Sequence, residues 1–286
     1  MTDLINPPPH INADYWRAGD PAELACGDLW SFSWDNEFLG LGVIATVAPT
    51  FVLVWPISLP EDEWFAPAVV LPPGQLGTVA AWPTRETGVG RHLLHRRYGT
   101  ALTPRTMRLV AEGLDESTLE DLPLEIAAQA VDAEMADFES ERMVDRWTSM
   151  CFIEWPDDRV GSAPFNPEVL QALDVNIREL MRLLSTDVPS ATSYFWGELI
   201  PTSSQVAAVA NQVETEPSAL ISPLWDDLLD AQLSASIKDS LLRIAAVRGI
   251  AEGEARNLLR SQVSLAARSA APAHERVAAA LLQLGG

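Results

Sequence analysis

Gly27-Asp-Leu-Trp-Ser-Phe-Ser-Trp34 begins the stretch of sequence that decides the fold, and the stretch extends to Leu114. It continues through Phe51-Val-Leu-Val-Trp-Pro-Ile-Ser58 and closes with Leu102-Thr-Pro104. Short runs rich in Val, Ile, Phe and Trp, separated by turn residues, are typical of a small antiparallel sheet. They predict strands over residues 29–34, 39–47, 51–57, 68–71 and 77–82. Thr103 and Pro104 then predict the start of a helix that ends at Gly113.

The order of these features resembles the PemK/MazF-like barrel of bacterial toxin–antitoxin systems, in which a Gly-Asp-[Ile/Val]-Trp strand begins the sheet. The resemblance covers residues 25–115 and implies a small SH3-like antiparallel β-barrel. In the ribonucleases of that family an Arg after the first hairpin stabilises the RNA phosphate, and a Thr or Ser follows the central strand. Ser58 matches the second position, whereas Phe38-Leu-Gly-Leu-Gly-Val43 offers no Arg at the first.

The resemblance therefore implies a degenerate toxin-like barrel. Without a guanidinium at the expected position, the main electrostatic term of RNA cleavage is missing. Arg85 is the one nearby substitute, so Ser58 and Arg85 are the candidate catalytic residues, and an exposed loop arginine is the alternative interpretation of Arg85. Glu61-Asp-Glu63 follows Ser58 directly and would repel RNA. Catalysis is therefore disfavoured.

Composition sets wider limits. The chain of 286 residues is long enough for two domains. No window approaches 18 apolar residues, and Met1–Pro9 does not read as a signal peptide, so we expect neither a membrane span nor membrane binding. Cys26 and Cys151 are the only cysteines, which predicts no disulfide framework and favours the cytoplasm. Glycine-rich phosphate loops and zinc spacings do not occur, so we expect no cofactor and no metal.

The net charge of −21 is concentrated in residues 116–190, which contribute about −12 of it. Such a field repels phosphate backbones and favours basic partners, although an acidic surface also serves solubility alone. We therefore expect a protein partner, leave a homo-oligomer open, and regard nucleic-acid binding as disfavoured.

The pattern along the chain predicts an α+β protein in four parts. These are an extended amino-terminal arm (1–24), the barrel (25–115), an acidic all-α connector (116–190) and a helical carboxy-terminal domain (191–286). Ser117-Thr-Leu-Glu120 has the spacing of a capping box. Helical periodicity predicts further helices over 127–146, 167–184, 205–213, 218–229, 235–247, 251–271 and 274–284. Residues 148–155 fit either an isolated strand or a buried turn.

One basic cluster, Arg91-His-Leu-Leu-His-Arg-Arg97, stands out in this acidic chain. The two histidines have the separation of a helical metal pair, but no acidic or cysteine ligand lies beside them. A basic strip that docks an acidic helix, such as the chain's own residues 116–140, is the better interpretation. Arg91, Arg96 and Arg97 are therefore predicted binding residues, together with Trp64 as an aromatic anchor.

Gln205-Val-Ala-Ala-Val-Ala210, followed by Glu214-Thr-Glu-Pro217, resembles the helix-turn-helix of phage-repressor-like domains over residues 201–230. Gln205, Ser218 and Ser222 are the candidate nucleic-acid contacts. The would-be reading helix offers hydroxyls, apolar groups and carboxylates in place of arginine or lysine. A helical packing module of the same shape is favoured over DNA binding.

The leading hypothesis is a non-catalytic regulatory or interaction protein of a bacterial toxin–antitoxin or defence-type system, with the barrel as a binding scaffold. One alternative is an endoribonuclease of the PemK/MazF type that uses Ser58 and Arg85. The second alternative is a transcriptional regulator that contacts DNA through residues 201–230.

Overall fold

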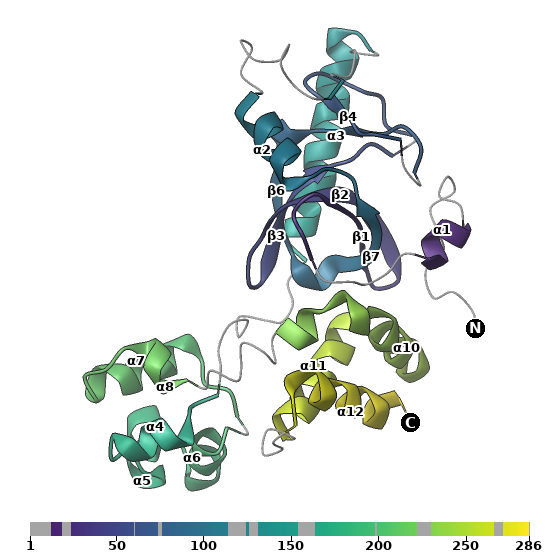
Figure 1. Ribbon diagram of the computed structural model, residues 1–286. Coiled ribbons are helices and arrows are strands. Elements are labelled where there is room, and N and C mark those ends of the chain that lie inside the picture. Colours follow the sequence, from purple (N-terminus) through teal and green to yellow (C-terminus); the bar gives the residue numbers. More distant parts are fainter. Residues whose placement is uncertain are drawn as a thin grey trace. The chain divides into compact units, whose positions relative to one another are not determined.

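The computed structural model divides the chain into two compact units (Figure 1). The first comprises Met1–Trp155 and Ser234–Leu242, and the second Pro156–Leu233 and Arg243–Gly286. The chain is a mixed α+β protein, as predicted. Across the residues that the structure describes, no helix is both long and apolar enough to cross a membrane. Those residues are 13–18, 24–59, 61–73, 76–113, 124–125, 131–153, 164–197, 199–221, 230–265 and 271–285.

A five-stranded antiparallel sheet forms the centre of the first unit, with the strand order β6-β3-β2-β1-β7. Its strands are β1 (Asp28–Trp34), β2 (Glu37–Val47), β3 (Phe51–Pro56), β6 (Thr87–Gly90) and β7 (Leu94–Thr100). The first three confirm the predicted strands. The predicted strands at 68–71 and 77–82 shrink to a separate pair, β4 (Val69–Val70) and β5 (Ala80–Ala81).

The two edge strands, β6 and β7, were not predicted. They follow each other in the chain and are joined by a single 3₁₀ turn, η2 (Arg91–Leu93). Among the described residues they are not paired with each other, so the sheet stays open and a closed barrel is not confirmed.

Each residue of the Gly27-Asp28-Leu29-Trp30 motif has a separate structural role. Gly27 has a φ of +87°, and a Cβ there would lie 1.8 Å from the carbonyl oxygen of Leu102, so only glycine fits. Leu29 and Trp30 point to opposite faces of the sheet because successive side chains of a strand alternate. The motif thus ties the start of the sheet to the segment before the next helix.

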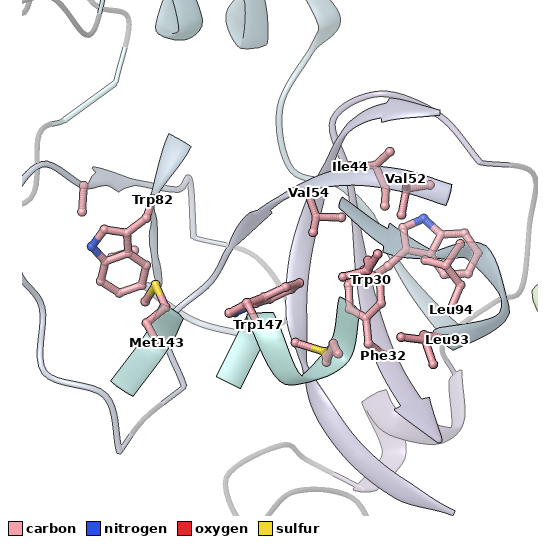
Figure 2. Close-up of a cluster of buried hydrophobic side chains, with 14 of the residues drawn as sticks. Trp30, Phe32, Ile44, Val52, Val54, Trp82, Leu93, Leu94, Met143 and Trp147 are labelled. Carbon is pink, nitrogen blue, oxygen red and sulfur yellow. The ribbon is translucent and has the colours of Figure 1, made fainter. Parts of the chain in front are cut away.

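Apolar side chains cover both faces of the sheet. On one face, α2 (Pro104–Gly113) packs its Met107 and Val110 against the core that contains Leu29. Thr103 caps this helix by accepting a hydrogen bond from the Thr106 amide at 3.1 Å, as predicted. On the other face, α3 (Ala133–Cys151) packs against the core around Trp30 (Figure 2).

The prediction of an extended arm over residues 1–24 is wrong for its one described part. Residues 13–18 form a short helix, α1 (Ala13–Ala18). The indole of Trp16 is buried, with its ring edge-on to Phe38 at 5.7 Å between centroids. Burial of this large apolar ring stabilises the helix, which is too short to show a helical period in the sequence.

Helix α3 starts and ends later than the predicted 127–146. Asp132 caps it by accepting from the Met135 amide, and the helix continues to Cys151. The open question of a strand or a turn at 148–155 is therefore answered by helix up to Cys151, while residues 154–155 lie outside the described residues. So does the capping box predicted at Ser117–Glu120.

Five helices of the second unit share one core. They are α4 (Pro167–Ala172), α5 (Ile177–Leu184), α6 (Val188–Phe195), α7 (Ser203–Gln212) and α8 (Pro217–Leu220). The predicted domain boundary at 190/191 falls inside α6, because Asp187 caps that helix and Pro189 occupies its first turn, where proline is tolerated. Helices on both sides of the predicted boundary thus belong together.

The helical carboxy-terminal region is present as predicted, in α10 (Lys238–Arg248), α11 (Glu252–Leu265) and α12 (Ala273–Gly285). A 3₁₀ turn, η4 (Ala235–Ile237), precedes α10. Arg256 of α11 is buried, and its guanidinium pairs with Glu252 at 2.8 Å one helical turn earlier.

Candidate functional site

The arginines of the basic cluster are held by groups of the chain itself. Arg97 on β7 makes a two-point ion pair with the fully buried Asp28 on β1, at 2.8 and 3.0 Å. The hydroxyl of Thr100 donates to the same carboxylate at 2.7 Å. Arg91 donates to the carbonyl of Pro49 at 2.9 Å.

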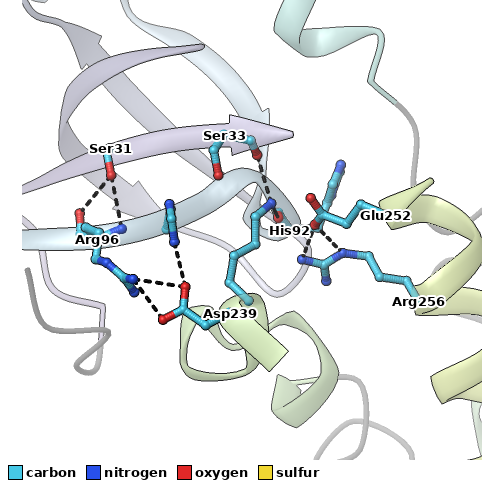
Figure 3. A network of polar contacts seen from close by, with 9 residues as sticks. Ser31, Ser33, His92, Arg96, Asp239, Glu252 and Arg256 are labelled. Atoms are coloured by element: carbon cyan, nitrogen blue, oxygen red, sulfur yellow. Dashed lines mark hydrogen bonds and ion pairs between the residues drawn. The ribbon is translucent and has the colours of Figure 1, made fainter. Parts of the chain in front are cut away.

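Arg96 pairs with a residue more than 140 positions away. Its guanidinium donates to both carboxylate oxygens of Asp239, at 2.9 and 2.8 Å, and His95 shares one of these oxygens at 3.0 Å (Figure 3). The backbone amide of Arg96 also donates to Ser31 on β1 at 3.1 Å. Two groups of the predicted basic strip therefore converge on one half-exposed carboxylate of the same chain.

Lys238, the only lysine of the chain, fixes the segment that carries Asp239. Its ammonium is fully buried and donates to the carbonyls of Ser33 at 2.8 Å and His92 at 3.1 Å. It also lies 5.3 Å from the ring centroid of Trp34, within cation–π range. Residues 234–242 are thus held against β1 and η2 by a desolvated cation.

These contacts set the protonation of the pair. Burial lowers the pKa of His95 below its ordinary value, against the opposing hydrogen bond to Asp239. Burial works to raise the pKa of Asp239, but the hydrogen bonds from His95 and Arg96 outweigh it and leave this pKa well below its usual range. At neutral pH, His95 is therefore a neutral donor to an ionised Asp239.

The two histidines do not form a metal pair. His92 lies in η2, and its Nε2 is 2.9 Å from the carbonyl oxygen of Ile153, whereas His95 on β7 faces Asp239. Within the described ranges, no group of three His, Cys, Asp or Glu side chains is arranged to hold a metal ion.

The candidate catalytic residues have different surroundings. Ser58 is only 3% exposed, and its hydroxyl oxygen accepts a hydrogen bond from the Ala80 amide at 3.0 Å. Arg85 is exposed and donates to the hydroxyl of Ser140 on α3 at 2.8 Å. Ser58 therefore holds β5 in place, and a phosphate group in solution cannot reach its hydroxyl.

Arg85 lines a pocket of about 220 Å³ between the sheet and α3. The pocket combines a polar rim with apolar side chains of the helix. Its lining residues are Pro56, Thr84, Arg85, Glu86 and Thr87 from the sheet side and Met143, Val144, Trp147 and Thr148 from α3.

Helix α3 is clamped to the sheet unit by one buried carboxylate. Asp62 accepts hydrogen bonds from Arg142 at 2.8 Å and from Arg146 at 3.0 and 2.6 Å, and also from the Leu59 amide at 2.8 Å. Apolar packing supports this clamp, with the Phe32 and Trp147 rings 5.5 Å apart (Figure 2).

The predicted docking of residues 116–140 on the basic cluster is wrong for the charges of the described residues 131–140, while residues 116–123 and 126–130 lie outside the described residues. The helix lies against the sheet, but its arginines Arg142 and Arg146 pair with Asp62 of the sheet unit. Its acids are exposed, namely Asp132, Glu134, Asp137 and Glu141. The ion pairs of Arg96 and Arg97 with Asp239 and Asp28 are the physical reason, because they already neutralise the predicted binding strip.

Trp64 is half-buried and packs against the core beneath α3, so it is not the exposed anchor that the sequence predicts. Exposed apolar side chains occur on α3, where Phe138 is 57% exposed, Val144 42% and Met135 43%. The sequence could have predicted their exposure, since they lie off the side of the helix that Met143, Trp147 and Met150 mark as buried by their spacing.

The structure describes two of the three helix-turn-helix candidates, Gln205 and Ser218. Thr202 caps α7, and Gln205 completes the capping box by accepting from the Thr202 amide at 2.8 Å. Its amide nitrogen lies 3.4 Å from the Tyr194 hydroxyl. Ser218 is exposed on the four-residue α8, and Ser222 lies outside the described residues. Gln205 is thus used within the fold.

No family model, curated protein or solved structure matches this chain.

Proposed function

We propose that this chain is a non-catalytic interaction protein of a bacterial toxin–antitoxin or defence-type system, acting in the cytoplasm. The observation that carries the proposal is the internal pairing of Arg96 and Arg97 with Asp239 and Asp28, together with the burial of Ser58. A ribonuclease needs preorganised positive groups that face the transferring phosphate. Here those groups are neutralised by the protein's own carboxylates.

Two features support a toxin-like, SH3-like barrel as the scaffold. The strand order β6-β3-β2-β1-β7, with the edge strands joined by one 3₁₀ turn, is compatible with such a barrel. The Gly27-Asp28-Leu29-Trp30 motif has a structural reason at every position: positive φ, the Arg97 ion pair, and one side chain in each core.

Charge supports a protein as the partner rather than a nucleic acid. The net charge is −21, and of the two candidate catalytic residues only Arg85 is exposed, whereas Ser58 is buried. Counterion release, which drives most nucleic-acid binding, needs several exposed cations on one surface. The use of Gln205 in a capping box likewise removes a base contact from the regulator alternative.

The test is co-expression of the full chain with the products of its neighbouring genes, followed by gel filtration. The proposal predicts a complex of fixed stoichiometry and no loss of single-stranded RNA added to the purified chain. Cleavage of that RNA, abolished by Arg85→Ala in a folded protein, would contradict the proposal and support the endoribonuclease alternative.

A further inference from the structure

We propose that the outward face of α3, together with the pocket beside it, binds a basic amphipathic segment of a partner protein. The outward face consists of Glu134, Asp137, Phe138, Glu141, Val144 and Asp145. This inference rests on the proposed interaction function and adds to it the surface and the chemistry of the partner.

The four carboxylates of this face lie on one side of the helix. Glu134, Asp137, Glu141 and Asp145 follow each other at intervals of three, four and four residues, which places them along one stripe. All four are exposed, and none of them is hydrogen bonded or ion paired within the part of the chain that the structure describes. Like charges at this spacing repel one another, and cations of a partner would relieve that repulsion.

Apolar side chains flank the acidic stripe on both sides. Phe138 is 57% exposed on one flank and Val144 is 42% exposed on the other. Exposed apolar groups within a polar rim are typical of interaction surfaces, because removing apolar surface from water when a partner covers it is favourable in free energy. The face therefore offers a partner both charge and apolar contact.

The opposite face of α3 holds the helix in a fixed orientation. Trp147 packs into the sheet core, and Arg142 and Arg146 point to Asp62. Both arginines of the helix thus pair with Asp62, and every charged side chain of the outward face is acidic. A surface fixed before binding costs a partner little ordering entropy.

The pocket gives the face a place for an anchor side chain. Val144 and Thr148 of α3 line it together with Arg85, and its volume is about 220 Å³. Trp147 and Met143 supply apolar lining, so an aliphatic side chain of the partner fits the chemistry of this pocket.

Charge distinguishes among the possible binding partners of this face. A second copy of the chain is disfavoured, because it would bring the same acidic stripe and the same net charge of −21 to the contact. Nucleic acids and anionic lipid surfaces are repelled for the same reason. A segment with lysines or arginines on one side and aliphatic residues on the other complements both the stripe and its apolar flanks.

The test uses a defined probe, a fluorescein-labelled helical peptide of leucine and lysine about five turns long. Its affinity for the full chain is measured by fluorescence anisotropy at ~0.15 M salt, where distant charges are screened. A scrambled peptide of the same composition is the first control. We expect the amphipathic peptide to bind the wild-type chain at least tenfold more tightly than the scrambled one.

Two variants of the face are compared with one matched variant elsewhere. Glu141→Lys with Asp145→Lys should weaken binding at least tenfold, and Phe138→Ala several-fold. Glu214→Lys with Glu216→Lys makes the same charge change at exposed positions of the second unit and should leave binding within twofold of wild type. Circular dichroism checks that each variant is folded. If the double charge-reversal variant is unfolded, Phe138→Ala still tests the face.

Equal loss in the matched variant, or equal binding of the scrambled peptide, would show general charge attraction and overturn the inference. The two proposals fail separately. A complex with a neighbouring gene product that survives Glu141→Lys with Asp145→Lys would reject this surface and keep the interaction function. RNA cleavage by the chain would reject the interaction function itself.

Discussion

Replacing Asp62 by asparagine should loosen α3 from the sheet unit while leaving the sheet intact. The Asp62 carboxylate is buried and accepts three hydrogen bonds from the guanidinium groups of Arg142 and Arg146. Asparagine has the same shape but carries no charge and has one acceptor oxygen fewer. The change therefore removes the attraction without creating a cavity.

The size of the effect follows from burial. Hydrogen bonds to charged groups contribute about 1.5–3 kcal/mol each when they are buried. The side chains of Arg142 and Arg146 are 37% and 22% exposed, so water partly replaces the lost acceptor. We expect a net loss of about 2 kcal/mol in the free energy that holds α3 closed, which is roughly a 30-fold increase in local opening.

Amide hydrogen exchange measures this opening directly. Exchange across residues 133–151 should become about 30-fold faster in Asp62→Asn, whereas amides of β1 and β2 should keep their protection. Glu63→Gln is the matched control, since it removes one charge from the exposed neighbouring position. If Asp62→Asn and Glu63→Gln exchange alike across α3, the carboxylate clamp does not hold the helix.

Three further predictions concern other parts of the fold. An amine-reactive reagent should modify the 0%-exposed Lys238 only after denaturation; rapid modification of Lys238 itself in the native chain, located by peptide mass spectrometry, would contradict its burial. Stability should fall as the pH drops below about 6.5, by up to ~1.4 kcal/mol per pH unit, because the unfolded His95 takes up a proton that the buried imidazole resists. The change of the urea midpoint with pH should be smaller in His95→Gln than in the wild-type chain, but unchanged in the exposed His274→Gln. The same pH dependence in all three proteins would refute the assignment of this effect to His95. Gly27→Ala should cost about 2–3 kcal/mol in the same urea titration, since its Cβ would overlap the Leu102 carbonyl, and an unchanged midpoint would disprove this clash.

The strands that the sequence predicts best are those with continuous β-branched and aromatic runs, such as Phe51–Pro56. Strands β6 and β7 escape prediction because they contain Gly88, Gly90 and the polar run His95-Arg96-Arg97. Their polar groups are buried by partners far away in sequence. Asp239 lies 143 residues from Arg96, and no local pattern predicts that pair.

Only part of the candidate site could be predicted, because its ion pairs also join residues that lie far apart in the sequence. The sequence locates the acidic helix and the basic cluster, and it predicts that the two dock on each other, whereas Arg96 and Arg97 pair with Asp239 and Asp28. It does not indicate which charges pair, because Asp62 looks like one of three equivalent acids in Glu61-Asp-Glu63. Only the fold shows that Asp62 is buried while Glu61 and Glu63 are exposed.

Incubation of the purified full chain with single-stranded RNA tests the proposed function most directly, namely that the sheet unit is a binding scaffold and not a catalyst. Because Arg96 and Arg97 are paired with carboxylates of the chain itself and Ser58 is buried, we expect the RNA to remain intact at every protein concentration. Cleavage at defined sequences that disappears in Arg85→Ala, with the circular dichroism spectrum unchanged, would contradict it.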